Sequence, residues 1–202
     1  MKYIDLSVAI NEKLPVYPGD PKVKIEPAGI LEKDGYADSF FYTGTHNGTH
    51  VDAPCHMIKG GKTLDEISVD RFAGDGVYIK VDGKFNLNEI KKVKIKKGDI
   101  VLFHTGMSEM YTSPDYFKKY PGMPEDVAKY LASKKVNMVG VDMCSVDHEP
   151  FPVHKILLRE EILLIENLTN LDKLKGQQFK IYALPIRLQI DGAPARVIAE
   201  VF

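Results

Sequence analysis

The segment of residues 46–56 constrains this chain more than any other, because it holds three of the six histidines in the sequence. Its histidines and its aspartate all fall at even positions: His46, His50, Asp52 and His56. On an extended backbone, side chains at even positions share one face. Imidazole and carboxylate groups are the ligands that zinc and similar divalent ions prefer. The pattern therefore predicts a metal site, in preference to a cluster of surface histidines in a turn.

The backbone of this segment is predicted to be extended and bent. A spacing of four, as between His46 and His50, also occurs in the helical HExxH zinc motif. However, Gly48 and its neighbours are poor helix formers, and Pro54 would end a helix. A straight strand at ~3.3 Å per residue would separate His46 and His50 by roughly 13 Å, too far for one ion. We therefore expect a bend, which Gly48 permits.

Composition limits the classes of function. A length of 202 residues suits one domain, residues 1–202, and the net charge of −1 gives no electrostatic case for binding nucleic acid. No apolar run is long enough to cross a membrane, the first residues do not resemble a signal peptide, and two cysteines do not indicate a disulfide framework. We expect a cytoplasmic protein that acts on a small molecule, with neither nucleic acid nor membrane as a partner.

Short apolar runs alternate with amphipathic stretches, which predicts a mixed α/β fold. Helices are expected after Thr63, which has Glu66 three residues on as in a capping box, and over residues 124–135 and 153–161. Buried strands are expected over residues 100–103, 138–141 and 162–165, and further strands over 179–184 and 196–201. Turns are expected at residues 17–21 and 192–194.

An ionisable residue directly follows each of the three buried strands: His104, Asp142 and Glu166. Ligand sites in α/β sheets lie beyond strand ends. A buried charge also costs several kcal/mol unless it is paired or bound to a metal. The three residues are therefore predicted to share a site, although a single such residue is often only the exit of a strand to the surface.

The motif His46-x-Gly48-Thr49-His50-x-Asp52-x-Pro54-x-His56 resembles the HxGTHxDxPxH signature of the cyclase family, which includes bacterial-type kynurenine formamidases and isatin hydrolases. The resemblance covers essentially the whole chain. The other matching segments are Ile4–Ser7, Tyr17–Asp20, Gly140–Asp147, His154 with Glu166–Leu171, and Gly192–Arg196.

The resemblance implies a β-barrel-like mixed sheet core with surrounding helices, a homodimer or higher homo-oligomer, and one or two divalent ions, with zinc favoured and manganese as the alternative. It implies a first metal site formed by His46, His50 and Asp52. Asp52 would bridge to a second ion held by His154 and Glu166. His56 would be the catalytic acid and base, whereas spacing alone leaves it open whether His56 is a ligand or a proton carrier.

Other residues have two interpretations each. Asp142 and Asp147 either orient the ligands or cap turns. His104 is a weak candidate for the pocket wall, and His148 is most simply a loop residue. Cys55, at an odd position, is expected to be a small buried residue that points away from the metals, and a nucleophilic pair of Cys144 with His148 has little support. Four further side chains are expected to line a pocket or pack in the core: Tyr17, Phe40, Phe41 and Met107.

The predicted chemistry is hydrolysis of an amide bond through metal-activated water. The family's best-known reaction, conversion of N-formylkynurenine to kynurenine and formate in tryptophan catabolism, is the first choice of substrate. Ring opening of a cyclic amide such as isatin is the alternative. The chain has no tryptophan and carries Tyr17 where some kynurenine formamidases have Trp, which weakens the choice of substrate but not of reaction. A non-catalytic protein that binds metal or small molecules on the same scaffold is the remaining alternative.

Overall fold

The computed structural model describes residues 2–202, so Met1, the first residue of the predicted domain, lies outside the described residues. Its strands are β1 (Lys2–Asp5), β2 (Lys24–Gly29), β3 (Asp38–Tyr42), β4 (His50–Asp52), β5 (Ala73–Lys80), β6 (Ile100–His104), β7 (Met138–Val141), β8 (Leu163–Glu166), β9 (Phe179–Pro185) and β10 (Gly192–Val201). Its α-helices are α1 (Leu31–Asp34), α2 (Leu87–Lys92), α3 (Glu125–Lys134) and α4 (Pro152–Arg159). Short 3-10 helices are η1 (Pro54–His56), η2 (Leu64–Glu66), η3 (Val69–Phe72), η4 (Met107–Met110) and η5 (Leu171–Leu174).

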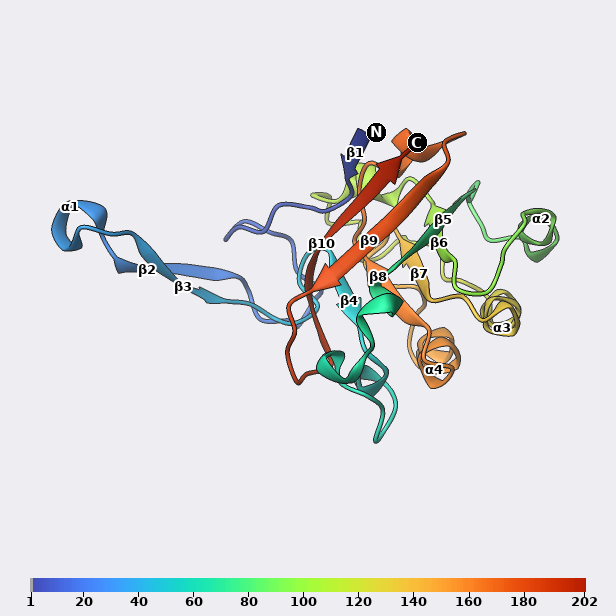
Figure 1. The fold of residues 1–202 in the computed structure, drawn as a ribbon, viewed down its shortest axis with the longest axis horizontal. Helices are drawn as coiled ribbons and strands as arrows, with labels where there is room; N and C mark the ends of the chain where they lie inside the picture. Colours follow the sequence, from blue (N-terminus) through green and yellow to red (C-terminus); the bar gives the residue numbers. More distant parts are fainter. Residues whose placement is uncertain (1) are drawn as a thin grey trace.

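Seven strands close into a barrel in the order β10-β4-β8-β7-β6-β5-β9, and β9 pairs back to β10. The strands β5 to β8 are mutually parallel, whereas β4, β9 and β10 pair antiparallel with their neighbours. β1 joins the outer edge of β10. Helices α2, α3 and α4 lie together on one side of the barrel (Figure 1). The predicted mixed α/β fold with a barrel-like core is therefore confirmed.

Alternation along the strands separates two apolar layers. The interior of the barrel is filled by one set of strand residues, which includes Val51, Ile100, Leu102, Met138, Leu163 and Ile165. The residues between them pack outward against α3 and α4; this set includes Val101, Phe103, Val139, Val141 and Leu164. Because successive side chains of a strand point to opposite faces, the parity of a residue decides whether it lies inside the barrel or beneath the helices.

The predicted strands and helices match the structure closely. β6, β7, β8, β9, α3 and α4 each lie within a few residues of the expected ranges. The helix expected after Thr63 is the short η2, which begins with the predicted capping box. Turn residues, as predicted, are found at 17–20, where the Asp20 amide bonds to the Tyr17 carbonyl at 3.0 Å.

The prediction of a turn at residues 192–194 was wrong, because these residues begin β10 and pair with β4. The amide of Ala53 donates to the carbonyl of Asp191, and that of Ala195 to the carbonyl of Thr49. Odd-numbered residues of β10 therefore form the hydrogen bonds to β4. Pro194 is at an even position, so its missing N–H removes no hydrogen bond from this ladder.

One part of the chain projects from the barrel as an arm, defined here as residues 24–42, which comprises β2, α1 and β3 (Figure 1). Its residues are largely exposed, including Phe40 and Phe41. The prediction that Phe40 lines a pocket or packs in the core was wrong, whereas Phe41 lines a surface hollow without being part of the core. Met107, which was predicted in the same way, is buried beneath the helices.

Within residues 2–202, no helix is both long and apolar enough to span a bilayer.

Candidate metal centre

Strand β4 presents two of the predicted ligands on the outer wall of the barrel. Val51 points into the interior, so its neighbours His50 and Asp52 point outward, on the side of α4. In the register of β4 with β8, His50 lies opposite Glu166, whose neighbour Ile165 also faces the interior. His50, Asp52 and Glu166 each have a ligand atom within 4.8 Å of the others. This group is the centre of the site.

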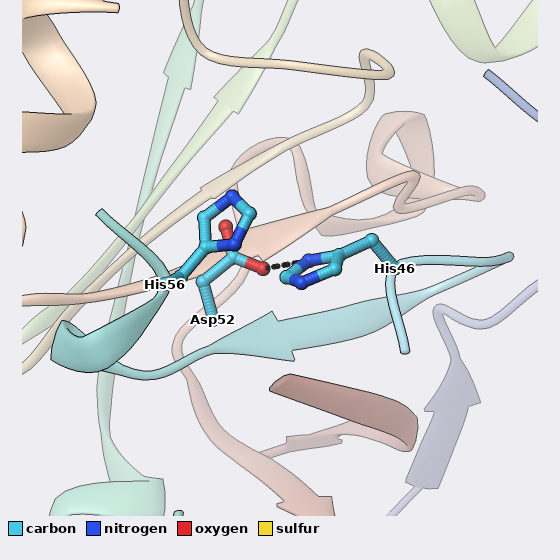
Figure 2. Close-up of side chains that lie close together, drawn as sticks. All are labelled: His46, Asp52 and His56. Atoms are coloured by element: carbon cyan, nitrogen blue, oxygen red, sulfur yellow. Dashed lines mark hydrogen bonds and ion pairs between the residues drawn. The ribbon is translucent and has the colours of Figure 1, made fainter. Parts of the chain in front are cut away.

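The predicted bend at Gly48 is confirmed, because this glycine has a φ of 67°. The bend is held in place by hydrogen bonds to its carbonyl from His50 Nδ1 at 2.8 Å and from Asn167 Nδ2 at 3.0 Å. It returns His46 to the outward face of β4, where His46 Nδ1 lies 2.8 Å from Asp52 Oδ1. Figure 2 shows this contact as a dashed line.

His56 reaches the same place from the other end of the segment. It is the last residue of η1, which follows β4 directly, and Pro54 is the first. The imidazole of His56 lies with its centroid 4.0 Å from that of His46, and Figure 2 shows it beside the Asp52 carboxylate. His46, Asp52 and His56 form a second group with ligand atoms within 4.8 Å of one another. Asp52 thus belongs to both groups.

Helix α4 carries His154, whose orientation is fixed by Asp147. His154 Nδ1 donates to Asp147 Oδ1 at 2.5 Å, which leaves Nε2 3.3 Å from Glu166 Oε1 and 3.8 Å from Asp52 Oδ2. Asp147 Oδ2 also accepts the amide of Val153 at the start of the helix. Asp147 therefore has both of the roles considered for it, because it orients a candidate ligand and caps a helix start.

The expectation that His104 and Asp142 share the site with Glu166 was wrong. Both continue the parity of interior residues, so they lie at the mouth of the barrel, whereas Glu166 points outward. Asp142 accepts hydrogen bonds from the amides of Thr105 and Gly106, and His104 Nδ1 lies 2.8 Å from the Tyr78 hydroxyl. Because each residue follows a strand, the sequence correctly placed all three at one end of the sheet. Whether a residue faces the barrel interior or the helices depends on its odd or even position along the strand.

Charges at the site are strongly coupled. Burial would lower the pKa of His46 and His50, but the neighbouring carboxylates together outweigh burial. Asp52 and Asp191 raise the pKa of His46 to about 9, and Asp52 and Glu166 raise that of His50 to about 10. Burial would likewise lower the pKa of His154, but hydrogen bonds to Asp147 and Glu166 raise it to about 10. Burial would raise the pKa of Asp52, but the adjacent His46 and His50 hold it well below its usual value.

His56 behaves differently from the other three histidines. Burial lowers its pKa, and the neighbouring His46 and His154 lower it further, against the opposing effect of Asp52. Its imidazole is therefore neutral near pH 7 and able to accept a proton.

The residues present fit a divalent cation. One nitrogen of His50 and one of His154 is engaged by an oxygen outside the cluster, so the other nitrogen of each faces Asp52 and Glu166. Two buried atoms, His50 Nε2 and Asp52 Oδ2, have no hydrogen-bond partner, although His50 Nε2 lies 3.2 Å from Asp52 Oδ1. Buried polar atoms without partners are costly, and imidazoles held from behind are typical of metal ligands.

The structure brings all six predicted site residues together, but it groups their ligand atoms differently from the expected sites. His46 lies with His56 rather than with His50, and His154 is in neither group, at 3.3 Å from Glu166. The assignment of ligands to two ions, and of acid–base chemistry to His56, stays a prediction.

The cluster opens into a cavity of about 180 Å³. Besides the clustered histidines and Glu166, its lining consists of Tyr17, Asp20, Met57, Cys144, Ser145 and Phe151. Tyr17 was among the candidates for the pocket, but His104 does not line it. Burial raises the pKa of the Cys144 thiol, which keeps it protonated and argues against a nucleophile. Cys55 is outside the lining and packs, half-buried, against the interior of the barrel.

One residue at the site was missed from the sequence. Asp191 precedes β10 and accepts a hydrogen bond from His46 Nε2 at 2.8 Å. The hydrogen bond from His46 holds the pKa of this carboxyl at about 2. Asp191 is 145 residues from His46, and only the pairing of β10 with β4 brings the two together. The signal in the sequence is its position, since Asp191 directly precedes the matching segment Gly192–Arg196.

The sequence model of the cyclase family, described as "Putative cyclase", matches residues 4–148. This match contains the segment 46–56 and Asp147, and it ends before His154 and Glu166. An uncharacterised protein of Methanocaldococcus jannaschii is 34% identical over 189 residues, which cover 91% of each chain. A kynurenine formamidase of Bacillus cereus is 27% identical over 204 residues, with 98% of this chain and 96% of that protein covered.

Solved structures agree with this family in fold. A potential metal-dependent hydrolase with cyclase activity superimposes with a TM-score of 0.81 at 31% identity, covering 98% of this chain and 96% of that chain. An isatin hydrolase, solved with the product analogue thioisatinate, superimposes with a TM-score of 0.85 at 25% identity, covering 98% of this chain and 91% of that chain.

Proposed function

The chain belongs to the cyclase family, and from this premise we propose that it is a metal-dependent hydrolase that cleaves an amide bond, with N-formylkynurenine as the first candidate substrate. The observation that carries the proposal is the cluster of oriented imidazoles around buried Asp52 and Glu166, which borders a cavity. Similarity to kynurenine formamidases supports the choice of substrate.

His46, His50, His154, Asp52 and Glu166 would hold one or two divalent ions, with zinc first and manganese second, because imidazole and carboxylate ligands suit both. A divalent ion bound there supplies hydroxide at neutral pH, because it lowers the pKa of water from 15.7 to about 7.

His56 acts as the proton carrier. Its neutral imidazole, half-buried beside Asp52, takes a proton as water adds to the carbonyl carbon of the substrate. It returns that proton to the amide nitrogen as the carbon–nitrogen bond breaks. The products are the free amine and a carboxylate, which is formate for a formamide. The second proton of the attacking water leaves the product acid for the solvent, so atoms and protons balance.

The cavity wall orients the substrate. Tyr17, Met57 and Phe151 provide an apolar surface for an aryl group, and Tyr17 itself is supported by an edge-on contact with Phe117 at 5.9 Å. Asp20 adds a carboxylate to the lining, which suits an amino group on the ring or side chain of the substrate.

The test is an assay of N-formylkynurenine, isatin and a simple formanilide, with the protein loaded with zinc or manganese. We expect turnover that chelation abolishes and metal restores, with N-formylkynurenine preferred. Preference for isatin would support the cyclic-amide alternative, which the isatin hydrolase structure favours. Metal held without turnover of any of the three would contradict the proposal and favour a binding protein.

The role of His56 is tested by His56→Ala. This variant should keep bound metal but lose about 10²–10⁴-fold in kcat, the usual contribution of a general acid–base group. His148→Ala is the matched control, since His148 is an exposed histidine outside the cavity lining. Near wild-type turnover in a metal-loaded His56→Ala sample would refute the assignment.

A further inference from the structure

Besides Asp52, the Asp191 carboxylate lies close to both His46 and His56. Its Oδ2 accepts a hydrogen bond from His46 Nε2 at 2.8 Å and lies 3.5 Å from His56 Nδ1. The side chain is 36% exposed, so it stands at the edge of the site rather than among the buried acids. The same carboxylate oxygen therefore lies next to His46, a candidate ligand, and His56, the candidate proton carrier.

The backbone holds Asp191 in place. Its carbonyl accepts the amide of Ala53, the residue after Asp52, at 2.8 Å. The next residue, Gly192, pairs with Asp52, and a Cβ at Gly192 would lie only 2.8 Å from His46 Cε1. The imidazole of His46 thus lies directly against the backbone of β10, with its Nε2 aimed at the carboxylate. The preceding loop is fixed as well, because the Leu64 amide donates to the Ile190 carbonyl.

In each of the three candidate histidine ligands, one ring nitrogen is held by an oxygen and the other faces the buried acids. His50 Nδ1 is engaged by the Gly48 carbonyl and His154 Nδ1 by Asp147, and each leaves Nε2 toward the acids. His46 is turned around, because Asp191 engages Nε2 and leaves Nδ1 2.8 Å from Asp52 Oδ1. The His46 ring is hydrogen-bonded to Asp52 and Asp191, so the engagement of Nε2 by Asp191 selects Nδ1 as the nitrogen that faces Asp52.

We propose that Asp191 is a positioning residue that selects the metal-facing nitrogen of His46 and places a negative charge beside His56. The first effect preorganises a ligand, since a carboxylate behind a metal-bound imidazole fixes the orientation and tautomer of the ring. The second stabilises the positive charge on His56 after it has taken a proton. The proposal rests on the proposed hydrolase function only for the role of His56, whereas the role of His46 requires only that a cation binds.

The first experiment measures metal affinity, without substrate, by competition with a chromophoric chelator. Asp191→Ala should bind zinc about 10–100-fold more weakly, the usual loss when a group behind a ligand is removed. Asp191→Asn should stay close to wild type, because its amide oxygen still accepts from His46 Nε2. The cobalt-loaded Asp191→Ala protein should also show an altered visible spectrum. Wild-type affinity and spectrum in Asp191→Ala would overturn the role of His46.

The second experiment measures kcat and KM. Asp191→Asn should lower kcat but leave KM and metal affinity close to wild type, because it removes only the charge beside His56. In a His56→Ala background the same substitution should lower kcat no further, since residues that act together are not additive. Unchanged kcat in Asp191→Asn, or a full additional loss in the double variant, would overturn the role of His56.

Asp70→Ala serves as the control in both experiments, because Asp70 is an exposed acid on η3 that does not line the cavity. It should match wild type in affinity, spectrum and kcat. If the wild-type protein turns over no candidate substrate, the proposed function fails, but the affinity measurement still decides the role of Asp191 toward His46.

Discussion

Single nitrogen and oxygen atoms define the metal centre, and their protonation links it to pH. In the metal-free protein the pKa is about 9 for His46 and about 10 for His50 and His154, so all three are protonated at neutral pH. A metal ligand must be a neutral imidazole. Metal binding near pH 7 is therefore expected to release protons, and affinity is expected to rise with pH up to those pKa values.

This proton release is measured by isothermal titration of zinc in two buffers of different ionisation enthalpy. The apparent binding enthalpy should differ between the buffers in proportion to the number of protons released. His46→Ala should release fewer protons than wild type. Identical enthalpies in both buffers would show that the imidazoles are already neutral.

Gly192 is the residue whose missing side chain leaves room for His46. A Cβ there would meet His46 Cε1 at 2.8 Å and the Val51 carbonyl at 3.0 Å. The second contact is with backbone, which cannot move aside as a side chain can. We expect Gly192→Ala to destabilise the protein by about 1–3 kcal/mol, as overpacking does, and to weaken metal binding. Urea denaturation with and without zinc measures both, and wild-type values would contradict the close approach.

Helix α4 depends, as an element, on Asp147. This buried carboxylate accepts the Val153 amide and orients His154, so it joins the start of the helix to the metal centre. Asp147→Ala should lower the free energy of unfolding by about 1–3 kcal/mol, because it leaves a buried N–H without a partner. It should also weaken metal binding, and Asp147→Asn should lose less of both.

A matched control for Asp147 is on α3, where Asp126 accepts the Val127 amide at 2.8 Å and does not line the cavity. Asp126→Ala should affect stability alone. Equal metal affinity in Asp147→Ala and Asp126→Ala would show that His154 does not depend on its carboxylate partner.

Elements with a strong local pattern could be predicted from the sequence. The buried strands, the helices α3 and α4, and the bend at Gly48 follow from apolar runs, capping residues and a glycine, which act over a few neighbouring residues. The failures concern contacts between distant segments. The sequence predicts a turn at the start of β10 because Gly192 and Pro194 are usual in turns, whereas only the pairing with β4 explains why they suit a strand.

The part of the candidate site that lies in one local segment was predictable, and the part that depends on contacts between distant segments was not. His46, His50, Asp52 and His56 are close in sequence, so their spacing alone indicated a metal site. His154 required the family resemblance, because one histidine on a helix carries no local signal. Asp191 was missed, and His104 and Asp142 were misplaced, because sheet register and strand parity around a closed barrel are properties of the whole fold.

Viewed as a whole, the molecule has an arm that its own barrel does not cover. Phe40 is 55% and Phe41 47% exposed, and they point to opposite faces of a two-stranded hairpin. An isolated hairpin is only marginally stable in water, and large exposed apolar patches mark interaction sites. Phe41 and Ile186 line one hollow, and exposed Ile186 continues into a second hollow of about 340 Å³ with Leu184 and Val69.

An isologous dimer buries the same surface of both copies, so we expect the arm and the adjoining hollows of one copy to pack against those of a second. We therefore expect a homodimer, measured by light scattering after gel filtration. A Phe40→Ser and Phe41→Ser double variant should be monomeric, whereas Phe202→Ser, at another exposed aromatic, should remain dimeric. A monomeric wild-type protein would refute the expectation.

The alternation along β4 has a consequence for how this chain tolerates change in length. One added or deleted residue within 49–53 would reverse the faces of β4. Val51 would then point toward the metal centre and the Asp52 carboxylate into the apolar interior of the barrel, so both metal binding and folding would be impaired. The tip of the arm, at residues 30–36, is free of such a constraint. Insertions and deletions are therefore expected to be tolerated at the tip of the arm but not in β4 and the residues on either side of it.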